Sequence, residues 1–74
     1  MDEAKRNALA KELKVLRARA GITQKELAEK SGVAECTIAF IESKNISVTP
    51  RIDTLVKLAK ALEVEEIALT KYLD

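Results

Sequence analysis

The chain has 74 residues, of which 47% are hydrophobic and 34% charged, so it has room for one small domain and not for two separate cores. Its 13 basic and 12 acidic residues give a net charge of +1. Its single cysteine cannot form an internal disulfide. Because the chain has no histidine, it lacks the usual ligands of zinc and the commonest general base. No apolar run approaches the ~18 residues of a membrane span and no signal peptide is visible, so we expect a cytoplasmic protein that is not an enzyme and binds no cofactor, metal or membrane.

The first predicted element is a helix over residues 3–20, which contain neither glycine nor proline. Its apolar residues recur three and four positions apart, at Leu9, Leu13, Leu16 and Ala20. This spacing places them on one face of an amphipathic helix. Gly21 directly afterwards is typical of a C-terminal cap, because glycine adopts the left-handed conformation without strain.

A second helix is predicted over residues 24–31, because the residues at its start form a recognisable capping motif. Thr23 and Glu26 are spaced as a capping box, in which the Thr23 hydroxyl accepts a hydrogen bond from the Glu26 amide and the Glu26 carboxylate accepts one from the Thr23 amide. Ile22 before the cap and Leu27 inside the helix are placed for a hydrophobic staple. The helix therefore has a well-defined beginning in the sequence itself.

Gly32 predicts a tight turn between this helix and the next one, because a sharp reversal of the chain requires a residue that tolerates positive φ. A third helix is expected over residues 34–43, with Ile38 and Ile41 on its inner face. Ala34 stands at its start in place of a serine or threonine cap, which typically costs a helix about 1 kcal/mol.

Two further helices complete the predicted all-α, five-helix fold of a single domain over residues 1–74. Pro50 suits the entrance of a helix over 51–63, because the amide that proline lacks has no partner there. The apolar stripe of that helix consists of Ile52, Leu55, Val56, Ala59 and Leu62. A short fifth helix over 65–73 carries four apolar residues, Ile67, Leu69, Tyr72 and Leu73. Because so small a monomer has few places to bury all four, we expect them to form a homodimer interface, with packing inside the monomer as the alternative.

Two short helices around a glycine turn, residues 23–43, form a helix-turn-helix if they cross at a steep angle. Ala28 supports such a crossing, because its methyl side chain allows the second helix to approach closely. The alternative is a generic αα-hairpin.

Residues 1–20 carry six basic and three acidic side chains, an excess that favours a polyanionic partner, although a solvated surface of mixed charge explains it equally well.

Several motifs follow the order of a known family. They are Leu16-Arg17, Gly21-Ile22-Thr23-Gln24, Glu26-Leu27-Ala28, Ser31-Gly32-Val33, Thr37-Ile38, Ile41-Glu42 and the run from Leu55 to Leu62. Through them, residues 9–70 resemble the phage-repressor and Cro type (XRE family) of lambda-repressor-like helix-turn-helix domain, which includes restriction–modification controller proteins. The resemblance implies a homodimer that binds a two-fold symmetric operator in double-stranded DNA and regulates transcription, as a repressor or controller, in a prokaryote or phage.

The resemblance also implies roles for individual residues. Arg17 and Glu42 match a buried ion pair that joins the first helix to the recognition helix, residues 34–43. The positions that read bases in the major groove are Glu35, Cys36, Thr37 and Phe40. The positions that contact phosphates are Gln24, Lys25, Ser43, Lys44 and Asn45.

The expected recognition face departs from the family pattern, because it contains no arginine, lysine, asparagine or glutamine. Glu35 can accept a hydrogen bond from a cytosine amino group, and Phe40 can contact a thymine methyl group. An acidic and aromatic face also suits a protein partner. The alternative function is therefore an antitoxin or adaptor-type interaction module on the same fold. Arg51 is a further departure, because the family often has a capping serine there.

Overall fold

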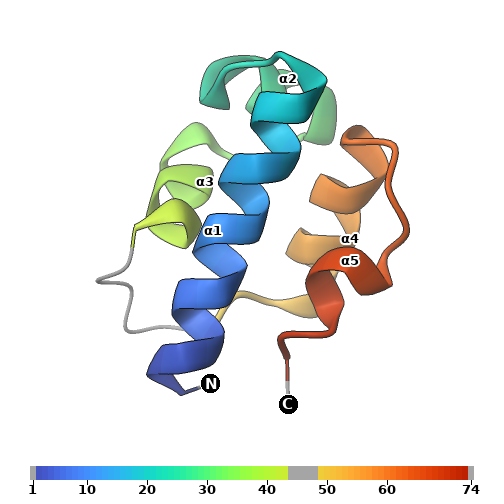
Figure 1. Cartoon of the computed structure of the whole chain (residues 1–74). Helices are drawn as coiled ribbons and strands as arrows, with labels where there is room; N and C mark the ends of the chain where they lie inside the picture. The colour runs from blue at the N-terminus through green and yellow to red at the C-terminus, as the bar shows by residue number, and fades with distance from the viewer. Residues whose placement is uncertain (1, 44–48, 74) are drawn as a thin grey trace.

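Five helices make up the part of the chain that the computed structural model describes, residues 2–43 and 49–73. They are α1 (Glu3–Ala20), α2 (Gln24–Ser31), α3 (Glu35–Glu42), α4 (Ile52–Ala61) and α5 (Ile67–Thr70). The described residues contain no strand, so the predicted all-α fold is confirmed. Helix α1 runs through the middle of the molecule, with α3 on one side and α4 and α5 on the other, while α2 lies beyond its C-terminal end (Figure 1).

The first helix has the bounds predicted from the sequence, because both of its ends are capped by local interactions. At its start, the side chain of Asp2 accepts a hydrogen bond of 2.8 Å from the Lys5 amide. At its end, Gly21 adopts the left-handed conformation with φ of 70°. Its amide donates to the Ala18 carbonyl, and the Ile22 amide reaches back to the Arg17 carbonyl. These two bonds form a Schellman motif, which satisfies carbonyls that the helix itself leaves free.

The predicted capping box of α2 is present in full. The Glu26 amide donates to the Thr23 hydroxyl at 3.0 Å, and the Thr23 amide donates to the Glu26 carboxylate at 3.0 Å. Hydrogen bonds that Thr23 donates to the Glu26 carboxylate, above all the one from its backbone amide, hold the pKa of the Glu26 carboxyl below its ordinary value. The helix ends at Gly32, whose φ of 75° makes the turn into α3.

Helices α3 and α4 are each slightly shorter than predicted, and neither has a side-chain cap at its start. Helix α3 begins at Glu35, after Ala34, which makes no side-chain capping bond. Helix α4 begins after Arg51, which likewise makes none. At its end, Glu63 adopts φ of 60°, and the next amide, that of Val64, donates to the Ala59 carbonyl. The helix therefore ends in a Schellman motif that uses glutamate where α1 uses glycine.

The fifth helix is much shorter than the predicted range 65–73. Only one turn, Ile67–Thr70, is α-helical, and Glu66 at its start makes no side-chain capping bond. The chain continues in tight turns, in which the amides of Tyr72 and Leu73 each donate to a carbonyl three residues earlier. A helix this short has little cooperative stability, so its position depends on its packing against other helices. In the described chain it packs against α1 and α4.

One continuous core joins all five helices. Its buried hydrophobic residues are Leu9, Leu13, Leu16, Leu27, Val33, Ile38, Ile41, Leu55, Leu58, Ala59, Leu62 and Leu69. Three assignments along the predicted stripes were wrong: Ile52 is 62% exposed at the start of α4, Ala20 is exposed at the end of α1, and Val56 is only half-buried. Leu58, which was not placed on the stripe, is fully buried instead, because α4 is covered by both α2 and α5.

Candidate nucleic-acid interface

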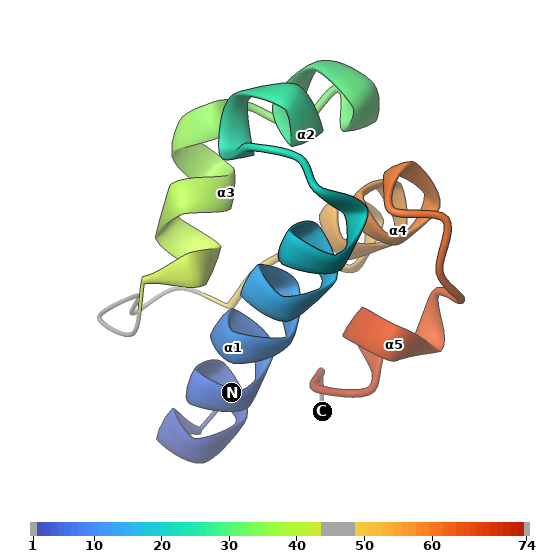
Figure 2. The same cartoon turned by 45° about the horizontal axis from the view of Figure 1, so that its top comes forward.

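Helix α3 buries one side and exposes the other, as expected of a recognition helix. Ile38 and Ile41 are buried against the core, and α3 packs against both α1 and α2. On the opposite side, Cys36 and Phe40 are exposed, and the Phe40 side chain is 62% exposed. Figure 2 shows α3 along one edge of the molecule, with α2 at its N-terminal end. The outer side of α3 is therefore accessible from solvent.

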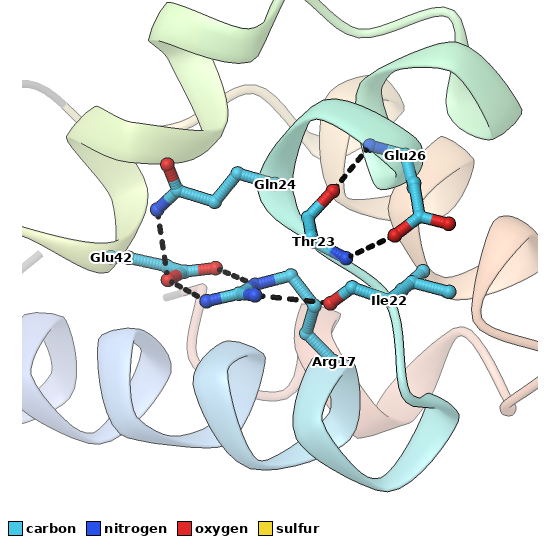
Figure 3. A network of polar contacts seen from close by, with 6 residues as sticks. All are labelled: Arg17, Ile22, Thr23, Gln24, Glu26 and Glu42. Atoms are coloured by element: carbon cyan, nitrogen blue, oxygen red, sulfur yellow. Dashed lines mark hydrogen bonds and ion pairs between the residues drawn. The ribbon is translucent and has the colours of Figure 1, made fainter.

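A polar network connects the C-terminal end of α3 to α1 and to the N-terminus of α2 (Figure 3). The Arg17 guanidinium forms a two-point ion pair with the Glu42 carboxylate, through Nε to Oε2 at 2.9 Å and Nη2 to Oε1 at 3.0 Å. Its third contact is from Nη1 to the Ile22 carbonyl at 3.0 Å. The predicted ion pair between α1 and α3 is therefore present, in the bidentate geometry that arginine favours.

The Glu42 carboxylate is buried, so its negative charge must be compensated by the Arg17 guanidinium. Glu42 is 3% exposed, whereas the Arg17 side chain is 22% exposed and so keeps some contact with water. The hydrogen bond to Glu42 raises the pKa of the Arg17 guanidinium above its ordinary value, although partial burial opposes this shift. Removing either partner alone leaves a charge without compensation, which is strongly destabilising in a protein interior.

Gln24 belongs to the same network. The sequence predicted it only as a phosphate ligand, and this internal contact was not predicted. Its Nε2 atom donates a hydrogen bond of 3.1 Å to Oε1 of Glu42. A primary amide has two N–H donors, so this bond leaves the second one for another acceptor. The contact joins residues that are 18 positions apart, and nothing in the local sequence signals it. Lys25, beside it at the start of α2, is exposed.

The other residues expected to contact DNA are only partly described. Glu35 is exposed at the start of α3, and Thr37 is half-buried. Ser43 is half-buried directly after α3, and its amide donates to the Phe40 carbonyl at 3.1 Å. Lys44 and Asn45, for which phosphate contacts were also predicted, lie outside the described residues.

The four residues predicted to form a dimer interface do not share one exposed face. Leu69 is fully buried in the core of the monomer, so its assignment to an interface was wrong. The physical reason is that the single turn of α5 packs against both α1 and α4, which cover this side chain. Tyr72 and Leu73 are half-buried against the same core, and only Ile67, at 59% exposure, is clearly on the surface.

Two kinds of site are not found in the described residues. No group of three or more cysteine, aspartate or glutamate side chains is arranged to hold a metal ion in residues 2–43 and 49–73. None of the described helices is both long and apolar enough to cross a membrane.

A protein-family model and a solved structure both match this chain. A family model described as HTH_3, helix-turn-helix, matches residues 13–69. The crystal structure of an HTH_3 family transcriptional regulator from Vibrio cholerae is similar over 96% of this chain, with 30% sequence identity and a TM-score of 0.82. The present chain covers 39% of the length of that regulator. A search of curated protein sequences found no match.

Proposed function

Because the chain belongs to the HTH_3 family of helix-turn-helix domains, we propose that it is a sequence-specific DNA-binding regulator of transcription, with α3 in the major groove. In helix-turn-helix proteins the first helix of the pair crosses the DNA backbone, and the second lies in the major groove with its N-terminal residues near the base edges. Here these helices are α2 and α3. A domain of this family is a regulator and not an enzyme, and a regulator of bacterial or phage genes acts in the cytoplasm.

The observation that carries this proposal is the polar network of Arg17, Gln24 and Glu42 together with the exposed side of α3. The network holds the N-terminus of α2 next to the C-terminal end of α3. With α3 in the groove, this geometry puts the N-terminal amides of α2 near the DNA backbone, where the helix dipole favours an anion. Phosphate binding then stabilises the orientation of α3, and the exposed side of α3 faces the bases.

Each residue of the interface has a proposed task. Phosphates are bound at the two ends of the helix pair, by Gln24, Lys25, Ser43, Lys44 and Asn45. Bases are contacted from the exposed side of α3 by Glu35, Cys36, Thr37 and Phe40. Because phosphate contacts carry little sequence information, the second group determines which operator is preferred.

The proposed binding form is a homodimer on a two-fold symmetric operator. Its proposed role is that of a repressor or controller. One helix of eight residues contacts a short stretch of DNA, and two copies related by a two-fold axis double that contact at half-sites about one helical turn apart. The exposed Ile67 of α5, with the half-buried Tyr72 and Leu73, is the proposed centre of the dimer interface.

Selection of bound sequences from a random DNA pool, followed by affinity measurements at several salt concentrations, tests this function. We expect one symmetric sequence to be enriched and its affinity to fall as salt rises. Lys25→Ala should weaken binding to operator and random DNA alike and flatten the salt dependence by about 0.9, the slope for one phosphate. The matched control is Lys57→Ala, which removes an exposed lysine from α4, outside the helix pair, and should leave the slope unchanged.

An antitoxin or adaptor-type module is the second candidate, because the exposed side of α3 is acidic and aromatic. Glu35 and Phe40 are both exposed there, and the described part of α3 carries no basic side chain. Such a surface suits a protein partner. If the random pool yields no enriched sequence, this second function replaces the first.

A further inference from the structure

The outermost stripe of α3 is apolar, and this has a consequence for the kind of base pair that it can select. Cys36, Ala39 and Phe40 stand at positions i, i+3 and i+4, so their side chains lie on one face of the helix. All three are exposed, although Ile38 and Ile41 on the opposite face are fully buried or nearly so. The stripe therefore faces outward and is not needed for the core.

Polar groups stand beside this stripe and not within it. Successive residues of an α-helix are 100° apart around its axis, so Glu35 and Thr37 fall on the two flanks of Cys36. Alanine and phenylalanine side chains offer no hydrogen-bond donor or acceptor, and a thiol is a weak one. A base pair facing the middle of α3 therefore meets apolar atoms.

In the major groove the largest apolar group of a base pair is the methyl group at C5 of a pyrimidine, and the groups that otherwise distinguish the base pairs are donors and acceptors. A donor or acceptor against the stripe would lose its water without gaining a partner, which is unfavourable. Building on the proposed function, we propose that the stripe of Cys36, Ala39 and Phe40 selects base pairs that carry a pyrimidine C5-methyl group. Thymine and 5-methylcytosine present the same methyl group at this position.

The size of the effect follows from the area that one methyl group buries. Burying a methyl-sized group is worth about 0.8 kcal/mol, which corresponds to about fourfold in affinity for each methyl group in contact. Phe40 is the largest residue of the stripe, and its side chain is 62% exposed, so it has the most surface to offer. We therefore expect Phe40 to account for most of the preference.

The test uses the operator obtained from the random pool and changes only methyl groups of the DNA. Each thymine is replaced in turn by uracil, which removes the methyl group and keeps every hydrogen-bonding group. At the sensitive positions, T·A is then replaced by C·G, with either cytosine or 5-methylcytosine. We expect uracil to weaken binding about fourfold at one or more positions in each half-site, and 5-methylcytosine to bind tighter than cytosine there by a similar factor.

Two protein variants assign the effect to the stripe. Phe40→Ala should reduce the thymine-to-uracil affinity ratio to nearly one at the position that it contacts. Ile52→Ala is the matched control, because Ile52 is equally exposed but lies at the start of α4, and it should keep the wild-type ratio. Circular dichroism of both variants checks that the helices are intact.

The outcomes separate this proposal from the function on which it rests. If an operator is enriched but uracil and thymine bind equally at every position, methyl selection is wrong and DNA regulation stands. If the ratio survives Phe40→Ala at all positions, another part of the protein reads the methyl groups and the role of the stripe is wrong. If no sequence is enriched, both proposals fail.

Discussion

Glu63 and Gly21 show how one backbone conformation is occupied by two very different residues. Both follow a helix, both have positive φ, and both make the backbone hydrogen bonds of a Schellman motif. Glycine adopts this conformation freely, whereas a residue with a Cβ atom is strained by roughly 1–2 kcal/mol. The strain at Glu63 is tolerated because Val64, the next residue, packs against the core.

Replacing Glu63 by glycine should therefore stabilise the protein. We expect Glu63→Gly to raise the free energy of unfolding by about 0.5–1 kcal/mol, since part of the relieved strain is offset by the greater entropy of glycine in the unfolded chain. Urea denaturation measures the change. Glu63→Ala is the control, because it removes the carboxylate but keeps the Cβ atom, and it should change stability by less than about 0.5 kcal/mol.

The ion pair of Arg17 and Glu42 should behave asymmetrically when one partner is removed. Arg17→Met leaves the buried Glu42 carboxylate without its partner, and we expect a loss of about 3 kcal/mol. Glu42→Leu should cost less, because the Arg17 side chain is 22% exposed and can reach water. The double variant should be more stable than the sum of the single losses predicts. Additive losses in a denaturant cycle would show that the two side chains do not stabilise each other.

Helix α2 depends on local hydrogen bonds at its start. Its capping box joins Thr23 and Glu26, and the pKa of the Glu26 carboxyl is lowered by the hydrogen bonds from Thr23. A carboxyl whose pKa is lower in the folded than in the unfolded state contributes stability above its unfolded pKa, about 4.3 for glutamate. That contribution disappears as the pH falls through the folded pKa.

Acid should therefore weaken α2 through Glu26. Between pH 5 and pH 3, the unmodified protein should lose more stability than the Glu26→Ala variant, which has no such carboxyl to protonate. Urea midpoints at the two pH values measure the difference. Glu29→Ala removes an exposed carboxylate from the same helix, outside the capping box, and should retain the full acid sensitivity. If the unmodified protein and the Glu26→Ala variant lost the same stability between pH 5 and pH 3, the expected effect of the capping box would be contradicted.

The short helix α5 carries the proposed dimer interface. Ile67 is 59% exposed, so a charged residue there should break a dimer without disturbing the core. We expect Ile67→Glu to halve the mass measured by light scattering at micromolar concentration and to leave the helical content unchanged. Ile52→Glu places the same charge at an equally exposed isoleucine of α4 and should leave the dimer intact. A dimer that survives Ile67→Glu would exclude α5 as its interface.

Features that depend on neighbouring residues could be predicted from the sequence. The bounds of α1 and α2, the cap at Gly21, the capping box of Thr23 and Glu26, and the turn at Gly32 were all predicted, because each involves residues at most five positions apart. The ion pair of Arg17 with Glu42 spans 25 positions, and it was predicted only through the resemblance to a family.

Features that depend on which helices cover a side chain could not be predicted from the sequence. Apolar periodicity assigns Leu69 and Ile67 to the same short helix, but only the packing of α5 against α1 and α4 buries the first and exposes the second. Likewise, the bond from Gln24 to Glu42 exists because α1, α2 and α3 converge at one point. Burial and long-range hydrogen bonds are properties of the packed helices, since segments far apart in the chain supply the atoms that exclude water or accept the hydrogen bond.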